Sequence, residues 1–327
     1  MLERLREPWT DQRAERVLGA LACLILGVIV FMIVFVAVRA WPSFHANGLS
    51  WFSAKGNVDV QLSRMVNSGA NPTPADYQIG AWPLIYATLL TTVLAAGLGL
   101  VFSTLSAIFI VEFAPEGIRR LIVPIVRLLA AVPSVIYGLI GILVLAPFVG
   151  NHLISQGRKK SVEFVIQLSG TSLLVAVVIL TIMITPIMIA ITVDGLYAIP
   201  RSWKEGAVAL GVNRWRAMWT VTVRAARPAI LAGAVLATAR AFGEAIMISM
   251  VSGSKGFAPN PADGLTFIFE PVKTLASNIV ENAESINAPA MRSTLYAMAL
   301  LLLLGGFGLS IASWIAKQPL KKYGTRG

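Results

Sequence analysis

The stretch that decides the fold is a polar interruption between two long apolar runs. It reads D-G-L-Y-A-I-P-R-S-W-K-E-G-A-V-A-L-G-V-N-R-W-R-A-M-W-T-V-T-V-R-A-A-R, from Asp194 to Arg227. Ser202 and Glu205 have the spacing of a capping box, in which each side chain satisfies a free backbone N–H at the start of a helix. The pattern predicts a helix that begins just after Pro200.

The second half of this stretch predicts that the helix stops and another begins. Gly211 suits the left-handed backbone position that commonly ends a helix. Asn213 can cap the following helix, because its side-chain oxygen accepts a hydrogen bond from a free backbone N–H. Two capped helices within one short loop predict a rigid knob projecting beyond the apolar runs.

The composition places the apolar runs in a membrane. Hydrophobic residues make up 56% of the 327 residues and charged residues 13%, with a mean hydropathy of +0.74, which excludes a soluble globule. Each of six runs is long enough to cross a bilayer as a helix, and together they predict an all-α integral membrane protein. The runs are Val17–Val38, Leu84–Val111, Leu121–Val149, Ser172–Val193, Ala229–Val251 and Leu295–Ala316.

The distribution of Lys and Arg predicts the orientation and the layout. With the N-terminus inside, the cytosolic segments hold 17 of these residues and the outer segments 9, so both termini are expected in the cytosol. The expected layout is a cytosolic tail (1–16), a first transmembrane anchor (17–39), an extracytoplasmic segment (40–81), a permease core (82–316) with a cytosolic loop at 194–227, and a cytosolic tail (317–327). The first run is too long for a signal-peptide core and has no small-x-small cleavage site after it.

Several kinds of chemistry are excluded by what the sequence lacks. It contains no G-x-x-x-x-G-K-[ST] motif, so the chain does not hydrolyse ATP through a P-loop. His45 and His152 are isolated and Cys23 is alone, so neither a metal site, a cofactor nor an internal disulfide is expected. The net charge of +11 suits anionic lipid and partner subunits rather than nucleic acid. Energy for any transport must come from a partner or an ion gradient.

Two opposite charges interrupt the fifth apolar run. Arg240 and Glu244 would each cost about 2.5–3.5 kcal/mol at the centre of a spanning helix. Four residues apart on one helix, they share a face and can touch. Either they form an ion pair that locks the helix, or Arg240 binds a tetrahedral oxyanion with its planar fork. In the second case Glu244 accepts a proton, which phosphate carries and sulfate does not.

A third feature lies in the third apolar run. Pro133 interrupts the run beside Ser134, and Tyr137 and Gly138 follow. The proline removes a backbone donor and allows a bend, which leaves Ser134 and Tyr137 as candidates to line a substrate pathway. A packed kink of small residues at a helix crossing explains the same pattern equally well.

The loop resembles the EAA loop of ATP-binding-cassette (ABC) importer permeases, which docks into a groove on the cytosolic ATPase. Glu205, Ala207 and Gly211 match its E-A-A, three residues, G pattern. Gly206 replaces the middle alanine, and Arg224 stands where a proline is expected. The resemblance implies that this loop couples the chain to an ATPase. It extends that role to two residues at the start of the second loop helix, Arg214 and Trp215.

A narrower resemblance covers nearly the whole chain. R-A-F-G-E (Arg240–Glu244) and L-L-A-A-V-P-S-V-I-Y-G (Leu128–Gly138) are similar to motifs of permease subunits in phosphate-specific transport (Pst) systems. N-G-L-S-W-F (Asn47–Phe52) and W-P-L-I-Y-A-T-L-L-T-T (Trp82–Thr92) favour the C-type subunit. Arg127 departs from the pattern, because that family commonly has Glu there.

The resemblance implies a fold, a function and a set of partners. The fold is that of a type I ABC importer permease, and the function is that of a non-enzymatic permease subunit of an ATP-driven phosphate importer in a prokaryotic inner membrane. The partners are a homologous PstA-like permease, a PstB-like ATPase dimer and an extracytoplasmic PstS-like phosphate-binding protein. The alternatives are a permease for another oxyanion such as sulfate or molybdate, a secondary transporter, or, least favoured, a membrane enzyme acting on lipid phosphates.

Overall fold

The helices account for nearly all of the regular structure. The computed structural model of the chain describes residues 7–162 and 167–317 and contains no extended sheet within them, only an isolated bridge between Gly253 and Val272. Six helical segments in these ranges are long and apolar enough to cross a membrane, which confirms the predicted all-α class. They are Ala14–Phe52, Pro74–Phe113, Ser134–Leu153, Leu173–Tyr197, Arg214–Phe242 and Pro289–Ala312.

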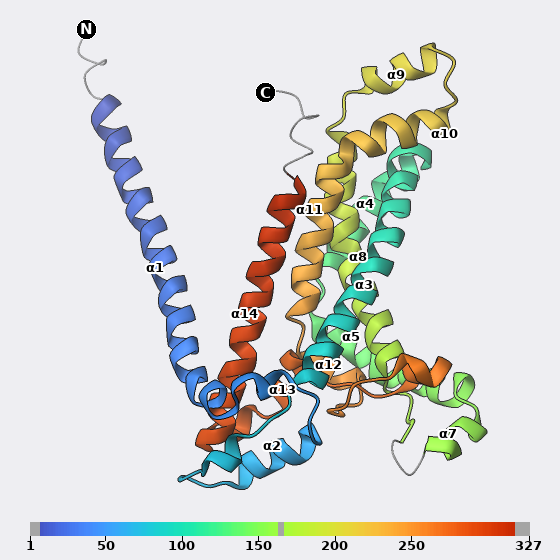
Figure 1. Ribbon diagram of the computed structural model, residues 1–327. Coiled ribbons are helices and arrows are strands. Elements are labelled where there is room, and N and C mark those ends of the chain that lie inside the picture. Colours follow the sequence, from blue (N-terminus) through green and yellow to red (C-terminus); the bar gives the residue numbers. More distant parts are fainter. Residues whose placement is uncertain (1–6, 163–166, 318–327) are drawn as a thin grey trace.

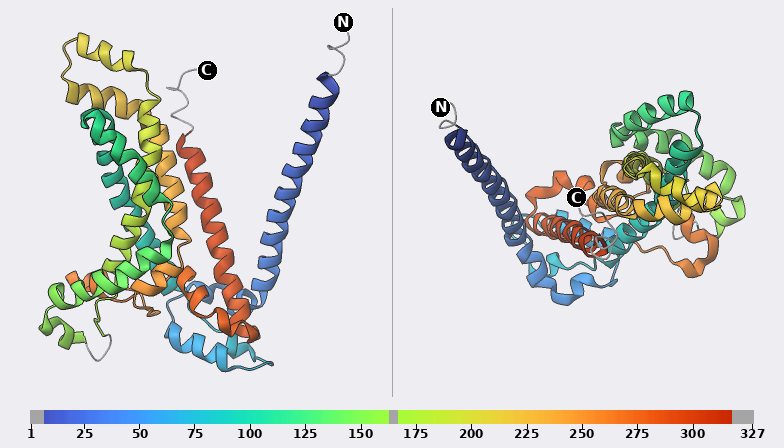
Figure 2. Two further views of the ribbon diagram at one scale, coloured as in Figure 1. Left: turned by 180° about the vertical axis from the view of Figure 1, so that it is seen from behind. Right: turned by 90° about the horizontal axis from the view of Figure 1, so that it is seen from above.

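The first helix, α1 (Glu7–Asn47), stands away from the rest of the molecule and approaches it only near its final turns (Figures 1 and 2). There it meets α14 (Pro289–Lys317), where the hydroxyls of Ser43 and Thr294 lie 3.1 Å apart. The apolar side chains along its middle are exposed in the isolated chain, as suits a surface that faces lipid or a partner. The helix begins inside the segment predicted as a cytosolic tail, and residues 1–6 and 318–327 of the predicted tails lie outside the described residues.

The centre of the bundle is α8 (Leu173–Tyr197), which packs between α3 (Trp82–Ile108) and α11 (Val223–Phe242). Side chains such as Met183 and Ile184 on α8 are completely enclosed. This helix is apolar on all sides, which is typical of a helix enclosed by other helices rather than one facing water.

The third apolar run, predicted as one spanning helix over Leu121–Val149, is two helices. The first, α4 (Glu116–Ala130), packs against α8 and ends before Pro133. Proline has no backbone N–H and disfavours the helical conformation in the residue before it. The spanning segment starts only at Ser134. It comprises α5 (Ser134–Ile140), the π-helix η5 (Gly141–Leu145), α6 (Ala146–Phe148) and the π-helix η6 (Val149–Leu153).

The fifth run is also divided, contrary to the prediction of a continuous helix over Ala229–Val251. Helix α11 ends at Phe242, and a separate short helix, α12 (Ile246–Val251), follows. Gly243 stands at the break, where its low helix propensity favours an end rather than a continuation.

The shorter elements gather at the two ends of the bundle (Figure 1). The end that we call the α2 end carries η2 (Gly48–Phe52), α2 (Val58–Asn67), η3 (Pro74–Tyr77), α7 (Gln156–Val162), η8 (Pro261–Phe269), α13 (Leu275–Glu281) and η9 (Ala283–Asn287). The opposite end, the α9 end, carries α9 (Arg201–Ala209), α10 (Arg214–Ala217) and the π-helices η4 (Phe109–Phe113) and η7 (Met218–Thr222). The first turn of α1 and the last turn of α14 point toward the α9 end.

Candidate functional site

The loop between α8 and α11 forms the two helices that the sequence predicts, and the first begins just after Pro200 as predicted, although its cap differs. Helix α9 begins at Arg201, with Pro200 in the capping position and no side-chain cap. Ser202 is therefore the second residue of the helix and not its cap, and the predicted capping box with Glu205 is wrong. Pro200 occupies the capping position, two residues before the Ser202 cap that the Ser-x-x-Glu spacing implies.

The predicted stop at Gly211 is confirmed. Its φ is +81°, in the left-handed region. The N–H of Gly211 donates to the carbonyl of Val208 at 2.9 Å, and the N–H of Val212 donates to that of Ala207 at 3.2 Å. These two bonds are the Schellman motif, which satisfies the last carbonyls of a helix. Gly211 and the carbonyl of Ala207 thus take part in the motif that ends α9, the projecting helix.

The second loop helix starts as predicted. The side-chain oxygen of Asn213 accepts hydrogen bonds from the N–H groups of Trp215 at 2.7 Å and Arg216 at 3.2 Å. Trp215 is more than half exposed, and its ring lies 6.0 Å from that of Phe113 and 5.8 Å from that of Trp219, centroid to centroid. An exposed aromatic cluster of this kind is typical of a membrane interface or a docking surface.

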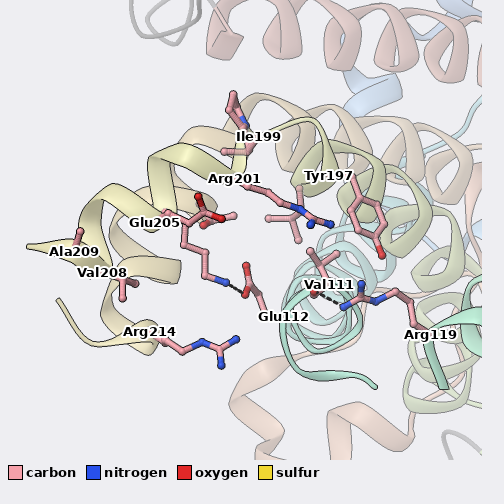
Figure 3. A pocket seen from close by; sticks show the side chains of 14 residues that line it. Val111, Glu112, Arg119, Tyr197, Ile199, Arg201, Glu205, Val208, Ala209 and Arg214 are labelled. Carbon is pink, nitrogen blue, oxygen red and sulfur yellow. Dashed lines mark hydrogen bonds and ion pairs between the residues drawn. The ribbon is translucent and has the colours of Figure 1, made fainter. Parts of the chain in front are cut away.

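A cavity of about 680 Å³ lies between α9 and the ends of α3 and α8 (Figure 3). Lys204 on α9 forms an ion pair with Glu112 on η4, so the projecting helix is tied to the end of the second spanning segment. Arg119 on α4 donates to the carbonyls of Ile110 at 2.9 Å and Val111 at 2.7 Å. Sequence reasoning missed these links. A signal was available for one of them, since Glu112 is a lone acid at the end of an apolar run.

Two of the predicted coupling residues line this cavity. Glu205 and Arg214 face it from α9 and α10. The side chain of neither residue forms a hydrogen bond or ion pair with any residue in the described ranges. The projecting loop therefore presents charges that the chain itself leaves unpaired.

The charged pair of the fifth run does not have the predicted geometry. Arg240 lies in the last turn of α11 and is exposed, whereas Glu244 lies beyond the helix end. They do not share a helix face, and no ion pair joins them in this part of the chain. Instead, the carboxylate of Glu244 accepts the N–H of Met247 at 3.2 Å and so caps α12. The helix-locking ion pair is thereby excluded in this conformation.

Ser134 and Tyr137, the predicted pathway residues of the third run, lie on α5, which packs against α12 after this break. Tyr137 is buried and donates its hydroxyl to the carbonyl of Leu129 at 3.0 Å. Ser134 is half-buried at the start of α5. A Cβ atom at Gly138 would lie 2.7 Å from the sulfur of Met250, so α5 and α12 pack closely. The short helices that follow the two breaks, α5 and α12, thus pack against each other.

Arg127, which departs from the family pattern, has an acidic partner. Its guanidinium lies 3.2 Å from a carboxylate oxygen of Asp194 at the end of α8. Both side chains are about 60% exposed: 60% for Arg127 and 63% for Asp194. Asp194 therefore supplies the opposite charge at this position.

A bundle of six apolar spans with a capped helix pair projecting from one end defines a class: the membrane-spanning permease subunit of an ABC importer. The chain belongs to the family described as the inner membrane component of binding-protein-dependent transport systems, whose model matches residues 99–316. The expected type I importer fold is confirmed.

Comparison with known proteins agrees with the predicted resemblance to phosphate permeases. The chain is 31% identical to the probable ABC transporter permease protein YqgH of Bacillus subtilis, over 91% of this chain and 87% of that one. It is also 31% identical to the phosphate transport system permease protein PstC 1 of Mycobacterium bovis, over 87% and 86%. A chain in the crystal structure of a bacterial alginate ABC transporter has the same fold, with a TM-score of 0.58 and 14% identity over 98% of this chain and 100% of that one. The predicted resemblance to C-type phosphate permeases is confirmed.

Proposed function

We propose that this chain is a permease subunit of an ATP-driven phosphate importer. The observation that carries the proposal is Arg240, an unpaired guanidinium beside a break in a spanning helix, in a chain similar over most of its length to phosphate permeases. A planar guanidinium matches the oxygens of a tetrahedral oxyanion and stays charged at any physiological pH. The partners would be a second permease, two ATPase subunits and an extracytoplasmic phosphate-binding protein.

Glu244 gives the site its preference for phosphate over sulfate. A carboxylate next to an anion site repels a fully ionised anion but accepts a hydrogen bond from a protonated one. The cap that Glu244 provides for α12 holds this carboxylate near the break. Gln at this position keeps an oxygen that can accept the same N–H but removes the charge, so selectivity and helix capping are separable by substitution.

The loop helices transmit the motion of the ATPase. Helix α9 ends in a rigid Schellman motif and is linked to η4 through Lys204 and Glu112. Pressure on α9 is therefore passed directly to the end of α3 as well as along the chain to α8. Rocking of these helices would open the break at Gly243 alternately to either side of the membrane.

The decisive experiment is uptake of labelled phosphate by the assembled transporter reconstituted in vesicles. Arg240→Ala is expected to abolish uptake, because the dehydrated anion loses its countercharge. Glu244→Gln is expected to reduce phosphate uptake and relax the rejection of sulfate. Near-normal phosphate uptake by Arg240→Leu/Glu244→Leu, at normal assembly and ATP binding, would refute the anion site.

The orientation is part of the same proposal: the α9 end and both termini face the cytosol, and the α2 end faces outward. Asn71 lies in the 40–81 segment and Asn213 between the loop helices, and both are exposed. A cysteine at Asn71 should react with an impermeant thiol reagent in intact cells, and one at Asn213 only after lysis. Cys23→Ser serves as the background, since Cys23 is exposed in the isolated chain. The reverse labelling pattern overturns the orientation.

A further inference from the structure

Phe242 is the last residue of α11 and lies between Arg240 and Glu244 at the break in the fifth run. Its ring points at Gly305 on α14, where a Cβ atom would lie 2.5 Å from Cζ and 2.6 Å from Cε1 of the ring. Carbon atoms in ordinary contact lie about 3.5–4.0 Å apart, so the ring occupies space that only glycine leaves free. The two helices lie side by side (Figures 1 and 2). This contact therefore joins the end of α11 to α14.

The close approach is particular to one glycine of α14. A Cβ atom at Gly306 or at Gly308 would meet no atom within 4 Å. The ring of Phe242 is only half-buried, and a cavity of about 190 Å³ adjoins it, lined also by residues of α3, α13 and α14. The contact with Gly305 is therefore a tight one on a side chain that is otherwise loosely enclosed.

The order of residues on α11 then sets the direction of Arg240. Ala237 and Ala241 are buried in the central core. Successive residues of an α-helix are turned by about 100°, so Phe242 lies to one side of Ala241 and Arg240 lies to the other. Because Phe242 meets α14, Arg240 lies on the face of α11 that is turned away from α14, where it is exposed. A rotation or tilt of this last turn would move both side chains together.

We infer that the contact of Phe242 with Gly305 positions Arg240 for anion binding. Helix ends fray and open locally unless they are tied to a neighbour, and α11 ends beside an exposed residue, Gly243. The ring against Gly305 holds this last turn and so fixes the direction in which the guanidinium is presented. The role in transport rests on the proposed function of Arg240, whereas the hold on the helix end does not.

The hold on the helix end is tested with a spin label on the purified full-length chain in detergent. The label is attached at Arg240→Cys in a Cys23→Ser background, and its mobility is read from the electron paramagnetic resonance spectrum. Gly305→Ala forces the ring away from α14, so the mobile fraction of the label should rise about twofold or more. Gly306→Ala is the matched control, because it adds the same methyl group one residue later, where it meets nothing. It should leave the spectrum unchanged.

A second label position separates loss of this contact from general loosening. Leu236 is exposed one turn earlier on the same face of α11. A label at Leu236→Cys should keep its mobility in both glycine variants. A variant that merely misfolds would change the spectra of both labels.

An exchange of volume between the two residues should restore the original spectrum. Leucine lacks Cζ, Cε1 and Cε2, the three ring atoms nearest to the Cβ position of Gly305. In Phe242→Leu/Gly305→Ala the new methyl group takes up part of the space that the ring vacates. Phe242→Leu alone leaves that space empty and should release the label at position 240 as Gly305→Ala does. Recovery in the double variant would assign the effect to the contact itself.

The role in transport is tested in the assembled transporter reconstituted in vesicles, with Arg240 in place. Gly305→Ala should lower the amount of phosphate imported per ATP hydrolysed about fivefold or more, because the anion site loses its alignment. ATP hydrolysis itself should stay within about twofold, since Gly305 lies outside the loop that carries the predicted coupling residues. Phe242→Leu/Gly305→Ala should restore the ratio. A contact that only stabilised helix packing would lower the yield of assembled transporter and leave the ratio unchanged.

Three results would overturn the inference: unchanged mobility at position 240 in Gly305→Ala, an equal change in Gly306→Ala, or an unchanged ratio of phosphate to ATP in Gly305→Ala. Only the last depends on the proposed function. Normal uptake by Arg240→Ala would show that the proposed function has failed, whereas the spin-label results would still report on the contact.

Discussion

Two clusters of charged side chains, one at each end of the molecule, differ in how they are neutralised. At the α2 end, Lys273 is only 10% exposed and is held between Asp59 at 3.0 Å and Glu281 at 3.3 Å. The remaining oxygen of Asp59 accepts the N–H of Gly256 at 3.0 Å. One ammonium thereby ties α2, the segment before α13 and the end of α13 into a single unit.

At the same end, the surroundings of Glu270 favour the protonated form of its carboxyl group. Glu270 is buried, and burial raises its pKa because it disfavours the carboxylate, with the nearby charge of Asp263 acting in the same direction. A hydrogen bond with the backbone of Asn260 opposes this shift only in part.

At the α9 end, by contrast, the side chains of Arg201, Glu205 and Arg214 have no hydrogen-bond or ion-pair partner among the described residues. The buried Lys273 at the α2 end is therefore neutralised within the chain, whereas these exposed side chains around the α9 cavity are left to be neutralised by something that binds. Predictions that separate the two ends should therefore show a stability effect at the first and a functional effect at the second.

The largest stability effect is expected for Lys273→Met. It leaves two carboxylates facing each other without their shared cation, and breaking a buried ion pair costs about 3–5 kcal/mol. Asp59 is 37% exposed and Glu281 23%, so we expect less, about 2–3 kcal/mol, after allowing for solvent screening. Thermal unfolding of the purified chain in detergent measures the loss.

A double variant sharpens this test. Lys273→Met combined with Asp59→Asn should be less destabilised than the sum of the single changes, because the second change removes part of the repulsion left by the first. If the destabilising effects of the two single changes simply add, then the three groups do not act as a unit. The contrast between the two ends would then lose its main support.

At the α9 end, Gly211→Val should impair function more than stability. No atom would crowd a Cβ at Gly211, so the effect comes from the φ of +81°, which a β-branched residue adopts at a cost of about 1–3 kcal/mol. The Schellman bonds would open and α9 would lose its fixed end. We expect phosphate-stimulated ATP hydrolysis in the reconstituted transporter to fall severalfold.

Gly206→Ala is the matched control for Gly211→Val. A Cβ at Gly206 also meets nothing within 4 Å, and Gly206 has ordinary helical φ inside α9, where alanine stabilises a helix by about 1 kcal/mol. It should leave coupling intact or improve it. Equal loss of coupling in both glycine variants would show that the loop responds to side-chain bulk and not to the left-handed turn.

The sequence predicted those features that rest on local rules. Gly211 and Asn213 were found because a left-handed stop and a side-chain cap depend on a few neighbouring residues. The six spans followed from the requirement that a backbone in lipid satisfies its own hydrogen bonds.

What could not be predicted depends on contacts distant in the chain or on competition between local signals. A hydropathy pattern does not show where a helix ends inside an apolar run. The third and fifth spans were therefore predicted as continuous, although helices end beside Pro133 and Gly243. The Lys204–Glu112 link joins residues 92 positions apart. Glu112 is visible in the sequence as a lone acid at the end of an apolar run, but nothing nearby identifies Lys204 as its partner. The Ser202 capping box failed because Pro200 set the start of the helix first.

The smallest effect is expected for Arg127→Ala. Its pair with Asp194 lies at the α9 end but is complete within the chain, and both side chains are largely exposed. Pairs of this kind contribute about 0–1 kcal/mol and weaken further as salt screens them. We therefore expect a slight loss of heat stability that disappears in high salt, and phosphate uptake within about twofold of the original. A larger fall in uptake, reversed by the exchange Arg127→Asp/Asp194→Arg, would make this pair part of the coupling path. Charges paired within the chain would then matter for function at the α9 end as much as the unpaired ones.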